Sequence, residues 1–328
     1  MNPEEIVATY LDEIKKVAVT NTTYTQAPPS RSIFAPENLD PVVKILVPIT
    51  APVRRILPRV EGFGQAANWN KITSKLDPQA GSTGTSVGFA DAGAPKQTTQ
   101  TTVFVSVPYK NLGRDVEMGR QALASNRGGS IEDMRAKLEN IKITEVLLGE
   151  EDMILNGDSA ADVTAFDGLA KTITTNSGSA TYLSASGIGI FAQNLFGYGA
   201  DYPTHIVTFP RQVRALADDL QGSGSIQRVV VDDQGAGVGG VHVSKVVNPV
   251  TGNLIDIVVS RYIGSYSHLL TVTSPAGENW IEMEDLDQLS IYDVPDTNHA
   301  IQSRIFETTV LKVIGEPFQQ KISGLSLT

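Results

Sequence analysis

The chain has 328 residues, of which 41% are hydrophobic and 19% are charged, and its formal net charge is −10. This composition is typical of a folded protein, and the length fits two domains or one elaborate domain. The absence of cysteine excludes disulfides, thiolate zinc sites and cysteine nucleophiles, and the negative charge argues against a protein that mainly grips nucleic-acid phosphates. No apolar run approaches the roughly 20 residues that span a bilayer, and Glu4 and Glu5 do not suit a signal peptide, so we expect a soluble intracellular product.

The first 17 residues predict a short amphipathic helix. Pro3 suits the first helical turn, and apolar residues recur at spacings of three and four, Ile6 and Tyr10 among them. Such a helix needs a surface to dock on, either in its own domain or on another molecule. Ile6 and Tyr10 are therefore candidate contact residues.

Residues 20–60 predict an extended strap, because they hold seven of the 17 prolines of the chain. The strap ends in the one basic cluster, Arg54, Arg55 and Arg59. Phosphate binding is one reading of this cluster. We favour ion pairs with carboxylates of a neighbouring molecule.

The stretch from Trp69 to Tyr109 has almost nothing to fold around. From Gly81 to Thr102, 12 of 22 residues are Gly, Ser or Thr, and Val87 and Phe89 are among the few large apolar residues. The returning segment 103–109 nevertheless alternates as a half-buried strand does. The stretch is therefore either a mobile loop or a hairpin that lies on another molecule, with Trp69, Val87 and Phe89 as candidate contacts.

A long amphipathic helix is predicted over residues 130–155, with Ser130 as its N-cap. Such a helix needs a long sheet to lie across. The apolar pattern of residues 301–314 predicts a long strand, and we expect it in the sheet beneath this helix.

Between these elements the pattern becomes that of a more ordinary α+β unit. We predict helices over 187–196 and from Pro210, a buried strand over 202–209, and short strands over 228–231, 241–247, 254–262 and 269–273. The fold class is α+β, a compact domain inserted into an elongated one.

No motif predicts an active site. The string 235–240 matches G-x-G-x-x-G, but a strand rather than a helix follows, so we read it as a loop between strands. The four histidines have no metal-ligand spacing. The acidic group Glu282, Glu284, Asp285 and Asp287 has oxygen ligands for a cation, although an exposed, solvated strand edge is the favoured reading. We predict no cofactor and no metal.

The order of these features resembles the major capsid proteins of tailed bacteriophages, which have the Hong Kong 97 fold. Two strings carry the resemblance: 50–64, followed by Ala66, Ala67 and Trp69, is similar to the entry into that family's extended loop, and 150–158 with 166–169 is similar to the end of its spine helix. The resemblance implies four parts. They are an N-terminal arm (1–47), an extended loop (61–110), a peripheral domain (48–60, 111–185 and 295–328) and an axial domain (186–294).

The resemblance also implies a function. We expect a structural, non-enzymatic protein that assembles with itself, as hexamers and pentamers, into an icosahedral virion shell around double-stranded DNA. It would assemble in the host cytoplasm, with separate scaffolding, portal and decoration proteins as possible partners. An encapsulin-like compartment for cargo enzymes is the alternative within the fold. A carbohydrate- or metal-using enzyme with residues 73–102 as a lid is the alternative outside it.

Overall fold

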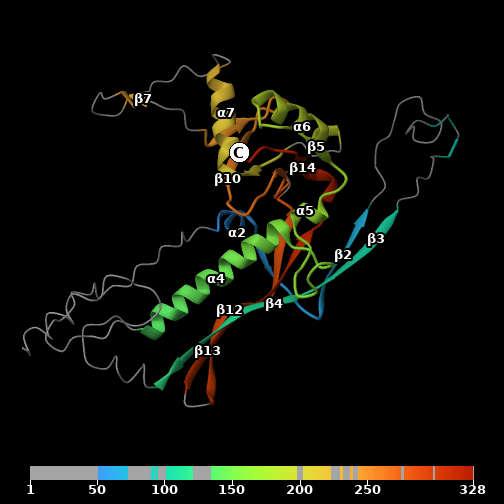
Figure 1. The fold of residues 1–328 in the computed structure, drawn as a ribbon. Helices are drawn as coiled ribbons and strands as arrows, with labels where there is room; N and C mark the ends of the chain where they lie inside the picture. The colour runs from blue at the N-terminus through green and yellow to red at the C-terminus, as the bar shows by residue number, and fades with distance from the viewer. Residues whose placement is uncertain are drawn as a thin grey trace, which may run out of the picture.

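Two β-sheets, each with strands from distant parts of the sequence, form the body of the protein (Figure 1). The computed structural model describes residues 51–72, 89, 91, 93–94, 101–120, 134–197, 202–222, 230–231, 237–238, 243–274, 277–297 and 300–327. Helices pack on both sheets, so the predicted α+β class is confirmed. None of the helices in these ranges has the length and apolarity that a membrane crossing requires.

The first sheet is a long, four-stranded one in the order β1-β12-β13-β4. Its strands are β1 (Arg59–Glu61), β12 (Ile281–Thr297), β13 (Ala300–Val313) and β4 (Lys110–Gly119). β1 runs parallel to β12, and the other neighbours are antiparallel. β13 is therefore an inner strand of this sheet, and its residues 307–311 are all buried. The predicted strand at 301–314 is confirmed.

The long helix α4 (Met134–Asn156) lies along this sheet, over β4 and β13 (Figure 1). At 1.5 Å per residue, its 23 residues span roughly 34 Å. Its C-terminal half buries Val146, Ile154 and Leu155 in the same core as Ile305 and Val310 of β13. The predicted helix and its place on the sheet are confirmed, while the predicted cap Ser130 lies outside the described residues.

Two short helices pack at the C-terminal end of α4. They are α2 (Pro52–Ile56), which buries Val53, and α5 (Leu169–Thr172), which buries Leu169. The turn between α4 and α5 depends on close backbone approach, because a Cβ on Gly157 would lie 2.2 Å from the carbonyl oxygen of Phe166. Glycine at this position lets the chain leave the helix and return beside it.

The second sheet has six strands in the order β5-β14-β11-β6-β10-β9. They are β5 (Ser177–Ser179), β14 (Gln320–Ser323), β11 (Tyr266–Leu270), β6 (His205–Thr208), β10 (Leu254–Val259) and β9 (Lys245–Val247). Helices α6 (Ala185–Gly197) and α7 (Pro210–Gly222) share one apolar core with it. The predicted helices and the strand at 202–209 are confirmed, and the predicted 269–273 strand begins three residues earlier.

Two hairpins leave this body. β2 (Ala66–Ile72) pairs antiparallel with β3 (Thr102–Pro108), and the pair projects away from both sheets (Figure 1). The predicted strand over 103–109 and its hairpin pairing are confirmed at this base. A smaller pair joins β7 (Val230–Val231) to β8 (Gly237–Val238). Within the glycine-rich string, Gly237 and Val238 are thus in a strand, while residues 235–236 and 239–240 lie outside the described ones.

One prediction about the acidic group is wrong. Glu282, Glu284 and Asp285 are buried, not solvated, because β12 has β1 on one side and β13 on the other. Their charge is met by Arg59 and Lys312, which are remote in sequence. The described residues contain no group of His, Cys, Asp or Glu side chains that could hold a metal ion.

Candidate functional site at the root of the hairpin

The hairpin β2–β3 has one face toward the body and one face open. Trp69 lies opposite Val105, and Ala67 opposite Val107. Ala67, Trp69 and Val107 pack in or against the core. On the other face, Phe104 lies opposite Asn70, and its ring is 64% exposed. A two-stranded ribbon is marginally stable in water on its own, so the open face is a surface that a partner would stabilise.

Two more exposed aromatic residues lie in the sequence just before β2 and between β2 and β3. Phe63, just before β2, is 85% exposed, and Phe89 is 59% exposed. Isolated exposed apolar residues are common on proteins, whereas a projecting two-stranded ribbon gains stability when another surface covers its open face. The hairpin is therefore the first candidate for contact with another molecule.

The root of the hairpin is fixed to the four-stranded sheet. The Tyr109 hydroxyl donates a hydrogen bond to the Glu284 carboxylate, and burial, followed by this bond and the charge of Glu284, raises the pKa of Tyr109 to about 12. The amide of Gly62 donates to the carbonyl of Asp285 at 2.8 Å. The ammonium of Lys312 lies 5.8 Å from the Trp69 ring centre, within reach of a cation–π attraction. Both legs of the hairpin are thus attached to β12.

A buried charged cluster lies beside this root. The Arg59 guanidinium donates two hydrogen bonds to Asp285, at 2.8 and 3.0 Å, and both Arg54 and Arg59 form ion pairs with Glu150. Glu307 lies 3.6 Å from Arg54 and 4.0 Å from Arg59. The side chains of Glu150 and Glu307 are at most 1% exposed. The cluster joins five elements: α2, β1, α4, β12 and β13.

The next residue of the helix, Glu151, holds α2 in place by neutral donors. One of its carboxylate oxygens accepts a hydrogen bond from the amide of Val53 at 3.2 Å, and the other accepts one from the Ser260 hydroxyl at 2.7 Å. Burial raises the pKa of Glu151, and these hydrogen bonds oppose that effect. Glu150 and Glu151 together anchor the segment that precedes the hairpin to the long helix.

The contact residues predicted from sequence fall into three groups. Arg54 and Arg59 are engaged by carboxylates of their own chain, so their charge is met within the subunit, while Arg55 is exposed. Trp69 is half-buried and Phe89 is exposed. Ile6, Tyr10 and Val87 lie outside the described residues. Contact of these eight side chains with a neighbouring subunit stays a prediction.

Sequence reasoning missed Glu150, Glu151 and Glu307. A signal was present for Glu151, because it continues the helical apolar series of Ile143, Leu147 and Ile154 at spacings of three and four. A carboxylate at such a position is buried unless the helix end is exposed, and it needs a partner. The identity of that partner is not readable from local sequence.

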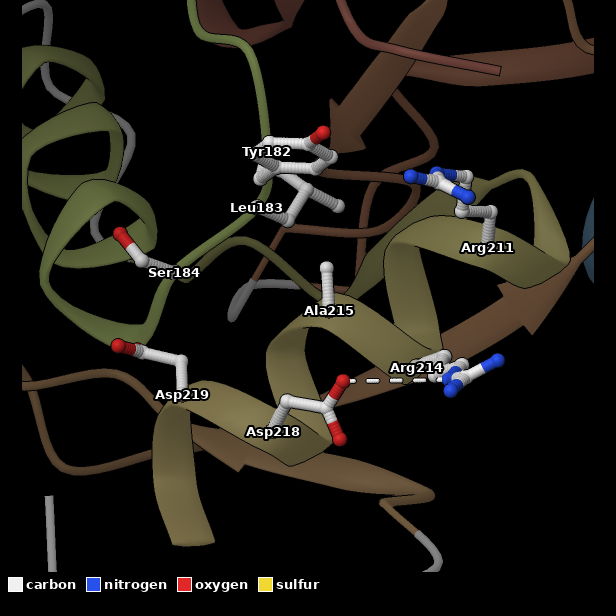
Figure 2. Close-up of a pocket in the computed structure, with 8 residues that line it drawn as sticks. All are labelled: Tyr182, Leu183, Ser184, Arg211, Arg214, Ala215, Asp218 and Asp219. Carbon is white, nitrogen blue, oxygen red and sulfur yellow. Dashed lines mark ion pairs between the residues drawn. The ribbon is translucent and has the colours of Figure 1, made fainter. Parts of the chain in front are cut away.

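A second candidate is a cleft of about 500 Å³ on the other half of the body, between α7 and the segment before α6 (Figure 2). The Arg211 guanidinium lies 5.7 Å from the centre of the Tyr182 ring, and its hydrogen bond to the hydroxyl lowers the pKa of Tyr182. Asp219 accepts a hydrogen bond from the amide of Ala185 at 3.0 Å, and Arg214 lies 3.9 Å from Asp218. Of the four charged side chains that line the cleft, Arg214 and Asp218 form an ion pair, while Arg211 contacts Tyr182 and Asp219 contacts a backbone amide.

No protein-family model matches the chain, and no curated protein matches it in sequence. Solved structures do match in shape. The SrpI encapsulin of Synechococcus elongatus PCC 7942 has a TM-score of 0.63 at 10% identity, with 89% of this chain and 94% of that chain covered.

Two phage capsids give similar values. The capsid of cyanophage P-SCSP1u has a TM-score of 0.60 at 9% identity and covers 93% of this chain and 97% of its own. The capsid of Myoviridae phage XM1 has a TM-score of 0.58 at 11% identity, with 88% of this chain and 97% of that chain covered. All three similarities extend over nearly the whole length of both chains. The chain has the Hong Kong 97-like capsid fold.

Proposed function

We propose that this chain is a structural shell subunit that assembles with copies of itself into an icosahedral capsid. The observation that carries the proposal is the projecting β2–β3 hairpin, whose outer face, with Phe104, has no cover in the described chain. The full-length similarity to shell-forming chains supports the same reading.

Within this proposal, the contents are double-stranded DNA and the particle is the virion of a tailed phage. The net charge of −10 favours a wall that holds DNA without adhering to it. The proline-rich sequence before residue 60 and the phage capsids among the similar structures support a virus. Separate portal, scaffolding and decoration proteins are proposed partners; decoration proteins accompany the capsid proteins of phage G, a structurally similar assembly.

The second candidate, a compartment for cargo enzymes, is favoured by the similarity to the SrpI encapsulin. The two candidates differ in what the shell contains. Purified particles should yield encapsidated DNA if the chain is a phage capsid protein, and a defined cargo protein without DNA if it is an encapsulin. Nuclease treatment before extraction removes nucleic acid bound to the outside.

We propose the four-part division of the resemblance with two changes. Residues 281–294 belong with the peripheral domain, since β12 pairs with β13 and β1. β5 and β14 complete the six-stranded sheet, which makes the axial unit larger than residues 186–294.

The test of assembly uses the hairpin. Deletion of residues 81–93 should leave a folded subunit that forms no normal shells by electron microscopy and sedimentation. Phe104→Ser should weaken assembly without lowering the unfolding temperature, because the ring is already exposed to water. Leu254→Ser, at a 55% exposed position on β10, is the matched control. Normal shells from the deletion variant would show that the hairpin is only a loop. Turnover by a monomer would favour the enzyme alternative.

A further inference from the structure

The segment 52–61, which contains α2 and β1, joins the first 50 residues to the hairpin and is held on the body by the buried charged cluster. Arg54 and Arg59 come from this segment. Glu150, Asp285 and Glu307 come from α4, β12 and β13 of the body. Any change in the balance of charge in the cluster therefore acts on the attachment of the segment.

The cluster contains one carboxyl group more than it has cations. With every group ionised, two guanidinium groups face three carboxylates, which leaves one negative charge unbalanced in the protein interior. A buried charge without a partner is strongly unfavourable. The surplus charge needs either a further cation or a proton, and no further cation contacts the cluster in the described part of the chain.

Geometry identifies Glu307 as the surplus group. Asp285 receives two hydrogen bonds from Arg59 and one from the Thr309 hydroxyl at 2.6 Å, and Glu150 is bonded to both arginines. Glu307 has only the longer contacts of 3.6 Å to Arg54 and 4.0 Å to Arg59. As long as Glu307 and Glu150 are both ionised and can only accept, neither oxygen of Glu307 has a hydrogen-bond partner. Its position on β13 is opposite Leu112 of β4, so that side of the cluster supplies no charge.

A proton on Glu307 removes the surplus and supplies a donor. Burial, followed by the charge of Glu150, raises the pKa of Glu307 from 4.5 to about 7, while Arg54 and Arg59 oppose the shift. The protonated carboxyl group then donates a hydrogen bond to the carboxylate of Glu150. Glu151, the next acid along the helix, faces Val53 and Ser260 instead.

We propose that a proton held between the carboxyl groups of Glu307 and Glu150 fastens the α2–β1 segment to the long helix, and that loss of this proton loosens the segment and the root of the hairpin. The direction of the pH dependence follows from the difference between the pKa of Glu307 in the folded and unfolded states. The folded-state pKa is raised, so the stabilisation is complete below pH 4.5 and is lost as the pH rises to about 7. Because every group belongs to one chain, the device operates in a single subunit and does not depend on shell assembly.

Hydrogen exchange of residues 52–61 in the full chain, measured from pH 5 to 8.5 and corrected for intrinsic rates, tests the proposal. For one titrating proton, protection should fall about tenfold per pH unit up to pH 7 and then level off. Glu307→Gln, which keeps the shape and donates a hydrogen bond to Glu150 at every pH, should abolish this fall. Glu145→Gln is the matched control, because Glu145 is exposed on α4, the helix that carries Glu150, and pairs with Lys142. It should keep the slope of the parent chain.

An equal slope in the parent chain and in Glu307→Gln would overturn the proposal. A second measurement tests the proposal even if Glu307→Gln does not fold. Infrared difference spectra of the parent chain should show the carbonyl band of a protonated carboxylic acid at pH 6, with a midpoint near pH 7. The absence of that band at pH 6 would overturn the proposal without use of any variant.

Discussion

His268 should make the six-stranded sheet sensitive to acid. Its side chain is fully buried, and neither ring nitrogen has a hydrogen-bond partner. On the neighbouring strands it lies opposite Val207 of β6 and Lys321 of β14, and the Tyr266 ring lies edge-on at 5.1 Å. No carboxylate faces it across these strands. Burial, followed by the positive charge of Lys321, lowers the pKa of His268 from 6.5 to about 3.

The direction and size of the effect follow from this shift. The folded-state pKa is depressed, so the stabilisation is present above pH 6.5 and is lost as the pH falls from 6.5 toward 3. Each pH unit in this window lowers the free energy of unfolding by about 1.4 kcal/mol. At pH 4.5 the loss is about 3 kcal/mol, a large part of the 5–15 kcal/mol that stabilises a typical domain.

Urea unfolding of the parent chain and of His268→Phe between pH 7.5 and 4.5 measures this loss. Phenylalanine keeps the aromatic contact with Tyr266 and removes both unpartnered nitrogens. The stability difference between the variant and the parent should therefore grow by about 1.4 kcal/mol for each pH unit below 6.5. His205→Phe is the control. His205 is half-buried, and the charge of Asp256 opposes the lowering of its pKa. The stability difference between His205→Phe and the parent chain should therefore grow less as the pH falls. Parallel stability curves for the parent and His268→Phe would refute the reasoning.

Three further predictions concern the long helix, the turn that follows it and the hairpin root. Gly149→Ala should stabilise the protein by up to about 1 kcal/mol, because the glycine is exposed within α4 and a Cβ there meets nothing within 4 Å. Gly157→Ala should cost at least about 2 kcal/mol, because its Cβ would overlap the Phe166 carbonyl; equal unfolding temperatures for this pair would contradict the account of the turn. Tyr109→Phe removes one hydrogen bond to Glu284 and should lower the free energy of unfolding by about 1 kcal/mol. The loss is limited because the Glu284 carboxylate keeps its ion pair with the ammonium of Lys312 at 3.2 Å. Faster hydrogen exchange confined to the hairpin root would confirm that the Tyr109–Glu284 bond acts locally, and an unchanged exchange rate there would contradict it.

The elements that sequence predicted well are those whose pattern is local. α4 and β13 have long apolar periodicities, and Pro210 marks the first residue of α7. The lack of large apolar residues over 81–102 leaves two interpretations, a mobile loop or a hairpin on another molecule, and the alternation of residues 103–109 favours a strand. For α4, β13 and α7 the deciding residues lie close together in the sequence, whereas β2 pairs with β3 across the whole intervening stretch.

The buried charges were not predictable in the same way, because their partners are far apart along the chain. Arg59 and Asp285 are separated by 226 residues, and Arg54 and Glu150 by 96. The register shifts between Asp285, Asp287 and Ser290 also break the two-residue period of β12. An acidic strand without clear alternation resembles a solvated edge, and only the tertiary pairing with β1 and β13 shows that it is interior.

The position of the cluster gives it a mechanical consequence. One leg of the hairpin follows directly from β1, which is paired to β12, and the other continues through Tyr109 into β4, which is paired to β13. Both legs are therefore extensions of the four-stranded sheet, and the projecting ribbon adopts the orientation of its root. Arg59 of β1 is held by Glu150 and Asp285, so under the proposal above the ionisation of the cluster acts on the strand that leads into the hairpin. A shell subunit built in this way would set the geometry of its contacts from a site buried within its own body.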